Sequence, residues 1–254
     1  MFFIFYIEYI FYRKYNTKNR PCQNRFLDKK FGSFDTKNLG AYFIMENFVQ
    51  KYETDILVLK PRINEDIYEH LETLRKYASE CESVIECGVR KCNSPWALVY
   101  GLMENGKDKK HLLLNDIQPT NSVDELYEYS KDLPVTIECK WGNDLDLDID
   151  TQYDMVFIDT WHVYGQLKRE LNKFAPLTSK YIVMHDTVVD GILGESIRCK
   201  MDSKQQSLDF NIPEEEILKG LMPAIIEFLS ENSDKWILDM HFKNNNGLTI
   251  IRRL

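Results

Sequence analysis

Residues 154–171 read "DMVFIDTWHVYGQLKREL" and combine three features in one short stretch. An apolar run leads up to Asp159, and His162 follows within one helical turn. Apolar residues then recur at helical spacing, at Tyr164, Leu167 and Leu171. The pattern predicts a buried strand that ends on a carboxylate and is followed by an amphipathic helix.

Short apolar runs and amphipathic stretches also alternate before and after this segment. Further strands are predicted in "SVIECGV" (83–89), "KHLLLNDI" (110–117), "PVTIECKWGND" (134–144) and "SKYIVMHD" (179–186). Helical patterns separate them over residues 64–81, 93–102, 122–133 and 164–174. Strands that are apolar almost throughout are typical of a parallel sheet covered on both faces.

The C-terminal part departs from this alternation. Pro213 and the acids after it predict the start of one helix, with apolar residues on a single face at Ile217, Leu221, Ile225 and Phe228. The segments "WILDMHF", "KNNNG" and "LTIIRRL" (236–254) then predict a β-hairpin with an Asn-Gly turn. We therefore predict an α/β, Rossmann-like, mostly parallel sheet with a C-terminal antiparallel hairpin and helices on both faces.

Length and charge limit the possible functions. The chain has 254 residues and a formal charge of −8, which favours one large domain and argues against sequence-independent binding to nucleic acid. Six cysteines stand at positions 22, 81, 87, 92, 139 and 199, and none forms a CxxC pair. We interpret them as buried free thiols of a cytoplasmic protein rather than as a zinc cluster.

The first 44 residues differ from the rest. They carry eight Lys/Arg and three Asp/Glu, so the remaining chain has a net charge of −13. The run "MFFIFYIEYIFY" is too short to span a bilayer and lacks the basic leader and cleavage site of a signal peptide. We predict that residues 1–44 are a disordered or non-native extension and that residues 45–254 are the functional domain; a peripheral membrane anchor is the alternative.

Five acids are expected to meet at one edge of the sheet. Glu86, Asp116, Asp159 and Asp186 stand at predicted strand ends, and Asp144 follows the third strand. In a doubly wound sheet, ligands bind beyond the carboxyl ends of the strands. Several carboxylates buried together cost free energy unless hydroxyl groups, an amine or a metal ion offset it. Each acid alone would be an ordinary strand-end or loop residue, and their co-occurrence is what predicts a ligand site.

The same segments carry a family resemblance over residues 80–254. In order and spacing, "VIECGVRKCNS" (84–94), "LLLNDIQP" (112–119), "WGND" (141–144), "DMVFIDTWHVY" (154–164) and "YIVMHDT" (181–187) resemble class I S-adenosylmethionine-dependent methyltransferases. The resemblance is closest to the macrocin O-methyltransferase and cephalosporin-hydroxylase-like group of sugar O-methyltransferases. It implies a seven-stranded sheet with its last strand antiparallel.

The resemblance implies a set of cofactor-binding positions for S-adenosyl-L-methionine. These positions are Glu86, Cys87, Gly88, Arg90, Ser94, Asp116, Asn143 and Asp144. The glycine would let the backbone approach the ligand, and Ser94 would cap a helix whose N-terminus receives the methionine carboxylate. Asp116 matches the acid that binds the ribose hydroxyls, and Asn143 and Asp144 match positions near the adenine. The usual first motif has two or three glycines, whereas "ECGVRKCNS" has one.

The last two motifs imply the reacting groups. Asp159, His185 and Asp186 match ligands of a divalent cation in the metal-dependent members, with Mg²⁺ as the candidate ion. His162 matches a residue near the acceptor and would be the general base, with Asp159 as a second catalytic residue. As alternatives, His162 could simply pack at a helix start, and His185 could be a hydrogen-bonded strand-end group. Thr160 stands where a glycine is common.

The sequence therefore predicts methyl transfer to a hydroxyl of a sugar or glycan-type small molecule. The alternative is a catalytically inactive, methyltransferase-like binding or scaffold protein. A nicotinamide-dependent oxidoreductase would need a Gly-x-Gly-x-x-Gly turn, which the chain lacks. The expected partner is a small-molecule acceptor, with no nucleic acid and no stable membrane span, and a homo-oligomer is left open.

Overall fold

The computed structural model describes residues 36–59 and 67–254, with side chains described for residues 43–57 and 67–254. The fold is described for residues 44–254, which form one compact unit. The predictions for the first 35 residues, and the predicted helix start at Asn64, lie outside the described residues. Helix α3 (Thr36–Lys51) runs across the predicted boundary at residue 45 without a break.

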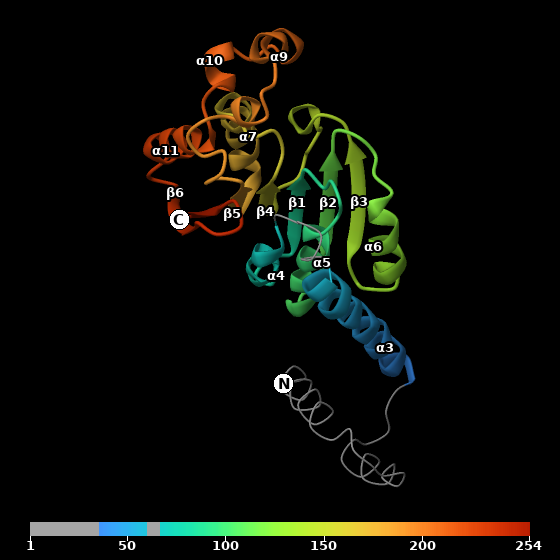
Figure 1. Ribbon diagram of the computed structural model, residues 1–254. Helices are drawn as coiled ribbons and strands as arrows, with labels where there is room; N and C mark the ends of the chain where they lie inside the picture. Colours follow the sequence, from blue (N-terminus) through green and yellow to red (C-terminus); the bar gives the residue numbers. More distant parts are fainter. Residues whose placement is uncertain (1–35, 60–66) are drawn as a thin grey trace. The chain divides into compact units, whose positions relative to one another are not determined.

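The centre of the fold is a seven-stranded sheet (Figure 1). Its strands are β1 (Ser83–Cys87), β2 (His111–Asp116), β3 (Thr136–Trp141), β4 (Tyr153–Ile158), β5 (Thr178–His185), β6 (Trp236–Phe242) and β7 (Leu248–Arg253). The order is β3-β2-β1-β4-β5-β7-β6. Strands β1 to β5 are mutually parallel, and β7 lies antiparallel to both β5 and β6. The predicted fold class, including the closing hairpin, is confirmed.

Helices cover both faces of this sheet. The longer ones are α4 (Leu71–Ala78), α5 (Ser94–Glu104), α6 (Ser122–Ser130), α7 (Tyr164–Phe174) and α11 (Leu221–Glu231). Helices α4, α5 and α6 pack on one face, and α7 and α11 pack on the other (Figure 1). The part of the chain that the structure describes also contains further helices: η1 (Tyr52–Leu59, a π-helix), η3 (Tyr68–His70), η4 (Asp144–Asp146), η5 (Ala175–Leu177), α8 (Glu195–Arg198), α9 (Ser203–Phe210) and α10 (Glu214–Ile217).

The predicted apolar faces are buried. Ile67, Leu71, Leu74 and Ala78 are at most 5% exposed, and the residues of the apolar stripe of α7 are at most 7% exposed. In the part of the chain that the structure describes, no helix combines the length and apolar composition that crossing a bilayer requires. Three of the described cysteines, Cys81, Cys87 and Cys92, are buried free thiols as predicted. Cys199 is exposed because it follows α8 in the surface segment between β5 and α11.

The helix predicted from Pro213 onward is wrong as a single element. The structure has α10, a break at residues 218–220, and then α11. Pro223 lacks the N–H that a continuous helix would bring to the carbonyl of Lys219, and this carbonyl instead accepts the N–H of Tyr164 at 2.9 Å. The break lets the chain pair with residues 190–194, which places those residues beyond the strand ends.

Candidate functional site

The register of the sheet brings the motif residues together. Cys87 of β1 pairs with Asn115 of β2 and with Ile158 of β4. The next residues of these strands continue side by side, because Gly88 N–H donates to the Asn115 carbonyl and Asp159 N–H donates to the Cys87 carbonyl, both at 2.8 Å. Three motifs therefore meet at the carboxyl ends of the central strands, as predicted.

The loop after β1 is shaped by Gly88 and Asp116. A Cβ on Gly88 would lie 1.9 Å from the Asp159 carbonyl oxygen, and the φ of Gly88 is +93°. The Asp116 carboxylate accepts the backbone N–H groups of Val89 at 3.0 Å and Arg90 at 2.8 Å. Arg90 and Cys92 also take left-handed backbone, with φ of +46° and +59°. Two non-glycine residues thus adopt a conformation that glycine adopts without steric cost, and such strain is concentrated at functional sites.

Glu86 is an acid at the centre of the sheet. Its side chain is fully buried, one oxygen accepts the Ser94 hydroxyl, and its other oxygen, Oε2, has no hydrogen-bond partner. Burial, together with the charges of Asp159 and Asp116, raises the pKa of Glu86 well above its usual value. The prediction that Ser94 caps the following helix is wrong: Asn93 occupies the N-cap position, because the Ser94 hydroxyl is committed to Glu86.

Asp144 and Glu170 form a buried acid pair beside this centre. Gln166 of α7 donates to Asp144 at 3.1 Å and to Glu170 at 2.9 Å, and Thr160 also donates to Glu170. Burial and then the charge of Asp144 raise the pKa of Glu170 well above its usual value. Glu170 therefore takes up a proton more readily than an exposed carboxyl, and as the protonated acid it can donate a hydrogen bond to Asp144. Asn143 caps η4 by accepting the N–H of Leu145 at 3.0 Å.

We expect Glu170→Gln to change the pH dependence of stability. A carboxyl whose pKa is raised by folding stabilises the fold fully below its unfolded pKa, about 4.3. That contribution is lost as the pH rises towards the folded pKa. Glutamine keeps the donor to Asp144 and the acceptor for Thr160 without this loss. The free energy of unfolding of the Glu170→Gln variant, taken relative to that of the wild type at the same pH, should rise by about 1–2 kcal/mol between pH 5 and pH 8.

Urea denaturation at the two pH values measures this difference. Glu170→Ala, which lacks both the donor and the acceptor, should be destabilised at either pH. Equal stability of Glu170→Gln and wild type at both pH values would show that the acid pair does not share a proton.

His162 lies at the centre of a second acidic cluster. Its Nε2 is 3.2 Å from Asp159, and its Nδ1 is 3.0 Å from Asp186 and 3.2 Å from Asp190. Burial lowers the pKa of His162, but the hydrogen bonds and charges of Asp159, Asp190 and Asp186 outweigh it and raise the pKa well above its usual value. In this state His162 is an imidazolium with a carboxylate at each ring nitrogen.

His185, the last residue of β5, contacts two acids of this cluster. Its Nε2 donates to the Asn245 carbonyl at 3.1 Å in the hairpin turn, and its Nδ1 lies 3.4 Å from Asp159 and 3.6 Å from Asp186. Burial lowers the pKa of His185, but the Asp159 and Asp186 charges raise it overall to about 9. Asp186 has a φ of +56°, a conformation that Asp tolerates better than most residues.

The cluster has the donor set of a cation site. Ligand atoms of Asp159, His162 and Asp186 all lie within 4.8 Å of one another. Two carboxylates and an imidazole suit a divalent cation such as Mg²⁺ or Mn²⁺. The sequence predicts His185 as the third ligand, beside Asp159 and Asp186. The structure instead groups His162 with these two carboxylates, and His185 contacts both of them.

The cavity that adjoins this cluster is small. The hollow beside Thr160, His162 and Glu170 holds only about 10 Å³. A groove of about 650 Å³ lies instead at the amino ends of β1 to β3, beside Lys110 and Thr136, and contains none of the predicted site residues. We place the candidate site at the strand ends, where the buried acids converge.

Several residues of the site are not identified by sequence reasoning. Gln166 and Glu170 complete the first acid pair, and Asp190 and Arg198 complete the His162 cluster. Glu170 carries a signal that could have revealed it, because it stands at helical spacing between the buried Leu167 and Phe174. Asp190 and Arg198 lie in a segment without periodicity, where no sequence signal marks them.

Comparison with solved structures identifies the fold. The chain is similar to an O-methyltransferase of Bacillus cereus in complex with S-adenosylhomocysteine, with 12% identity, a TM-score of 0.50, and coverage of 91% of this chain and 96% of that one. It is also similar to a proposed caffeoyl-CoA O-methyltransferase of Staphylococcus aureus, with 14% identity, a TM-score of 0.51, and coverage of 85% and 100%.

The chain has a methyltransferase fold. At these identities the likeness shows the fold alone. No protein-family model and no curated protein matches the chain.

Proposed function

We propose that this protein is an S-adenosylmethionine-dependent O-methyltransferase that acts on a hydroxyl of a sugar or glycan-type small molecule. The observation that carries the proposal is the convergence of Glu86, Asp116, Asp159 and Asp186 beside the glycine cradle at Gly88. The fold supports it, because the Bacillus cereus O-methyltransferase of this fold was solved in complex with S-adenosylhomocysteine. The resemblance of the strand-end motifs to sugar O-methyltransferases supports the acceptor class.

The residues around the first loop fit the cofactor. Glu86 offers a buried carboxylate oxygen without a partner, which an ammonium group such as that of a methionine moiety would satisfy. Gly88 leaves the backbone open to close approach. The Asp116 carboxylate is half-buried and, beyond its three backbone N–H partners, keeps a lone pair for ribose hydroxyls. By the same resemblance, Asn143 and Asp144 would lie near the adenine of the cofactor.

The His162 cluster fits activation of the acceptor. When bound, S-adenosylmethionine supplies an electrophilic methyl group, and a divalent cation supplies a Lewis acid that lowers the pKa of a hydroxyl. Asp159 and Asp186, with His162 or His185, would hold the cation. His162 carries a proton on each ring nitrogen in the described state. To act as the general base, His162 would first have to release one ring proton to solvent, and that nitrogen could then accept the hydroxyl proton. A cation held by Asp159 and Asp186 would favour this release by lowering the pKa of His162.

Calorimetric titration with S-adenosylmethionine tests the proposal. We expect saturable binding and a rise in Tm with ligand concentration. Asp116→Ala should weaken the affinity by about 10–100-fold, since a hydrogen bond to a charged group contributes about 1.5–3 kcal/mol. Asp148→Ala, in the exposed loop after η4, is the matched control and should bind like the wild type. Absence of both heat and thermal stabilisation in the unsubstituted protein would favour the scaffold alternative.

A further inference from the structure

The carboxylate of Asp190 links the His162 ring to an arginine from a separate helix. The side chain of Asp190 is 0% exposed. Arg198 donates to it through Nε and Nη2, both at 2.7 Å, and the His162 Nδ1 lies 3.2 Å from the same carboxylate. Burial raises the pKa of Asp190, but Arg198 and His162 outweigh this and lower it. The Asp190 carboxylate therefore bridges the guanidinium of Arg198 and the imidazole of His162.

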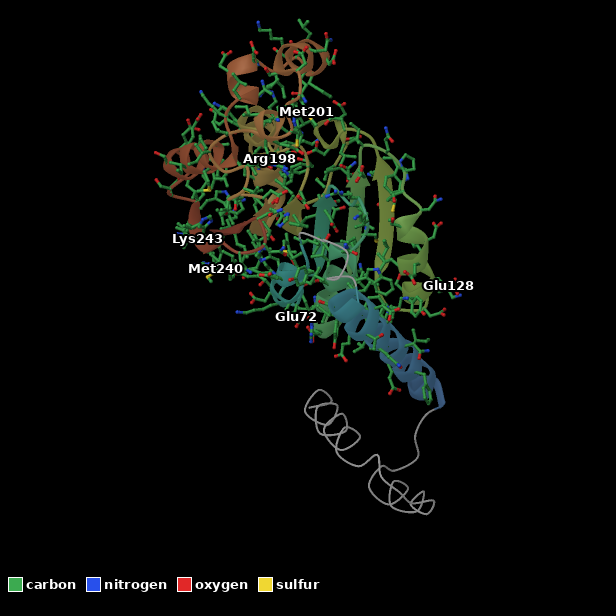
Figure 2. The ribbon with its side chains drawn as sticks, in the orientation of Figure 1. Glu72, Glu128, Arg198, Met201, Met240 and Lys243 are labelled. Atoms are coloured by element: carbon green, nitrogen blue, oxygen red, sulfur yellow. The ribbon has the colours of Figure 1, made fainter. Side chains whose placement is uncertain are left out.

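The backbone fixes both ends of this chain of contacts. Asp190 N–H donates to the Asp186 carbonyl at 3.0 Å, and the Asp190 carbonyl accepts the N–H of Leu221 at 2.9 Å, so Asp190 is held between β5 and α11. Helix α8 is docked on His162 itself, because Glu195 N–H donates to the His162 carbonyl at 2.9 Å. Figure 2 shows Arg198 on the side of the sheet where the parallel strands end, with Glu72 on the opposite side.

The geometry of the arginine contact is that of a clamp. Two parallel N–H···O bonds fix a carboxylate in orientation as well as position, which a single ammonium contact does not achieve. Arg198 itself is 46% exposed and does not fill the core. Its removal would leave the packing intact and would free the buried Asp190 to rotate or take up a proton.

We propose that Arg198 is a positioning residue that acts through Asp190 to fix the orientation of the His162 imidazole. Asp190 contacts Nδ1 at 3.2 Å beside Asp186 at 3.0 Å, so that the opposite nitrogen stays directed at Asp159. The role of this clamp would be to align His162 for activation of the acceptor hydroxyl, and this role rests on the proposed function. The contacts that define it do not.

The ring N–H protons of His162 report the clamp directly. The chain has five histidines, so ¹H–¹⁵N spectra of the ring nitrogens can be assigned with a His162→Gln variant. At pH 7 the unsubstituted protein should show a His162 Nδ1–H that exchanges slowly with water. In Arg198→Gln this exchange should be at least about tenfold faster, since loss of one charged hydrogen bond is worth about that factor. Arg198→Lys should restore part of the protection.

Arg169→Gln is the matched control. Arg169 makes an ion pair of similar length with Glu216 at 2.7 Å and is 36% exposed, but touches neither Asp190 nor His162. It should leave the His162 signal unchanged. An unchanged signal in Arg198→Gln, or a His162 Nδ1–H already lost to exchange in the unsubstituted protein, would overturn the clamp. Titration of S-adenosylmethionine into the same proteins separates the two proposals: failure to bind contradicts the proposed function and leaves the spectroscopic result standing.

Discussion

Replacing Gly88 with alanine is expected to destabilise the protein by about 3–5 kcal/mol, the range of severe backbone and packing conflicts. The added Cβ would lie 1.9 Å from the carbonyl oxygen and 2.6 Å from the carbonyl carbon of Asp159. Both neighbours are backbone, so no side chain can rotate away. The φ of +93° adds strain for any L-residue with a side chain. The ends of β1 and β4 must therefore separate, which also displaces Asp159.

Urea unfolding at pH 7 measures this effect. Gly106→Ala is the matched control, because a Cβ at Gly106 meets no atom within 4 Å. Its free energy of unfolding should stay within about 1 kcal/mol of the wild type. If Gly88→Ala unfolded at the same urea concentration as Gly106→Ala, the close approach of β1 and β4 described above would be wrong.

Loss of either His162 or Asp186 is expected to reduce methyl transfer by about 10²–10⁴-fold, the usual contribution of a positioned acid–base group. The affinity for S-adenosylmethionine should be retained in both His162→Ala and Asp186→Ala, because Glu86, Gly88 and Asp116 are untouched. Asp186→Asn is the sharper variant: asparagine tolerates the left-handed backbone at φ +56° and removes only the charge.

Formation of S-adenosylhomocysteine, with catechol and simple glycosides as vicinal-diol probes, measures this turnover. Asp148→Asn, an exposed acid outside the cluster, is the control and should turn over like the wild type. Wild-type rates in both cluster variants would remove His162 and Asp186 from the reaction and would leave the cluster as a structural feature.

The fold follows from the sequence because its signals are local. The central strands are short apolar runs buried on both faces, whereas the edge strands β3 and β6 are more exposed. The helix α7 is marked by the helical spacing of Tyr164, Leu167 and Leu171. The hairpin is marked by its Asn-Gly turn, where Asn245, Asn246 and Gly247 all have positive φ. The exception is local only in part: Pro223 is a local signal, whereas the pairing of residues 218–220 with 190–194 is not. Together they divide one predicted helix into two.

The site is only partly predictable from the sequence. Its acids stand at predicted strand ends, whereas no sequence pattern marks the residues that contact those acids and His162. Because Asp116 and Asp159 stand at the carboxyl ends of strands, they lie at that edge of the sheet whatever conformation the following loop adopts. Asp190 reaches His162 only because the segment after β5 folds back over the strand ends, a long-range event without periodicity. Ser94 shows a different limit of sequence reasoning. Serine is a common helix N-cap, but the Ser94 hydroxyl donates its hydrogen bond to the buried Glu86 carboxylate instead.

A crystal structure of the full chain with S-adenosylhomocysteine tests most directly whether these strand ends form a single nucleoside site. We predict the ribose hydroxyls within hydrogen-bonding distance of Asp116, the amino group at Glu86, and the sulfur facing the His162 cluster. A ligand bound elsewhere, for example in the groove beside Lys110, or no ligand at saturating concentration, would contradict the account.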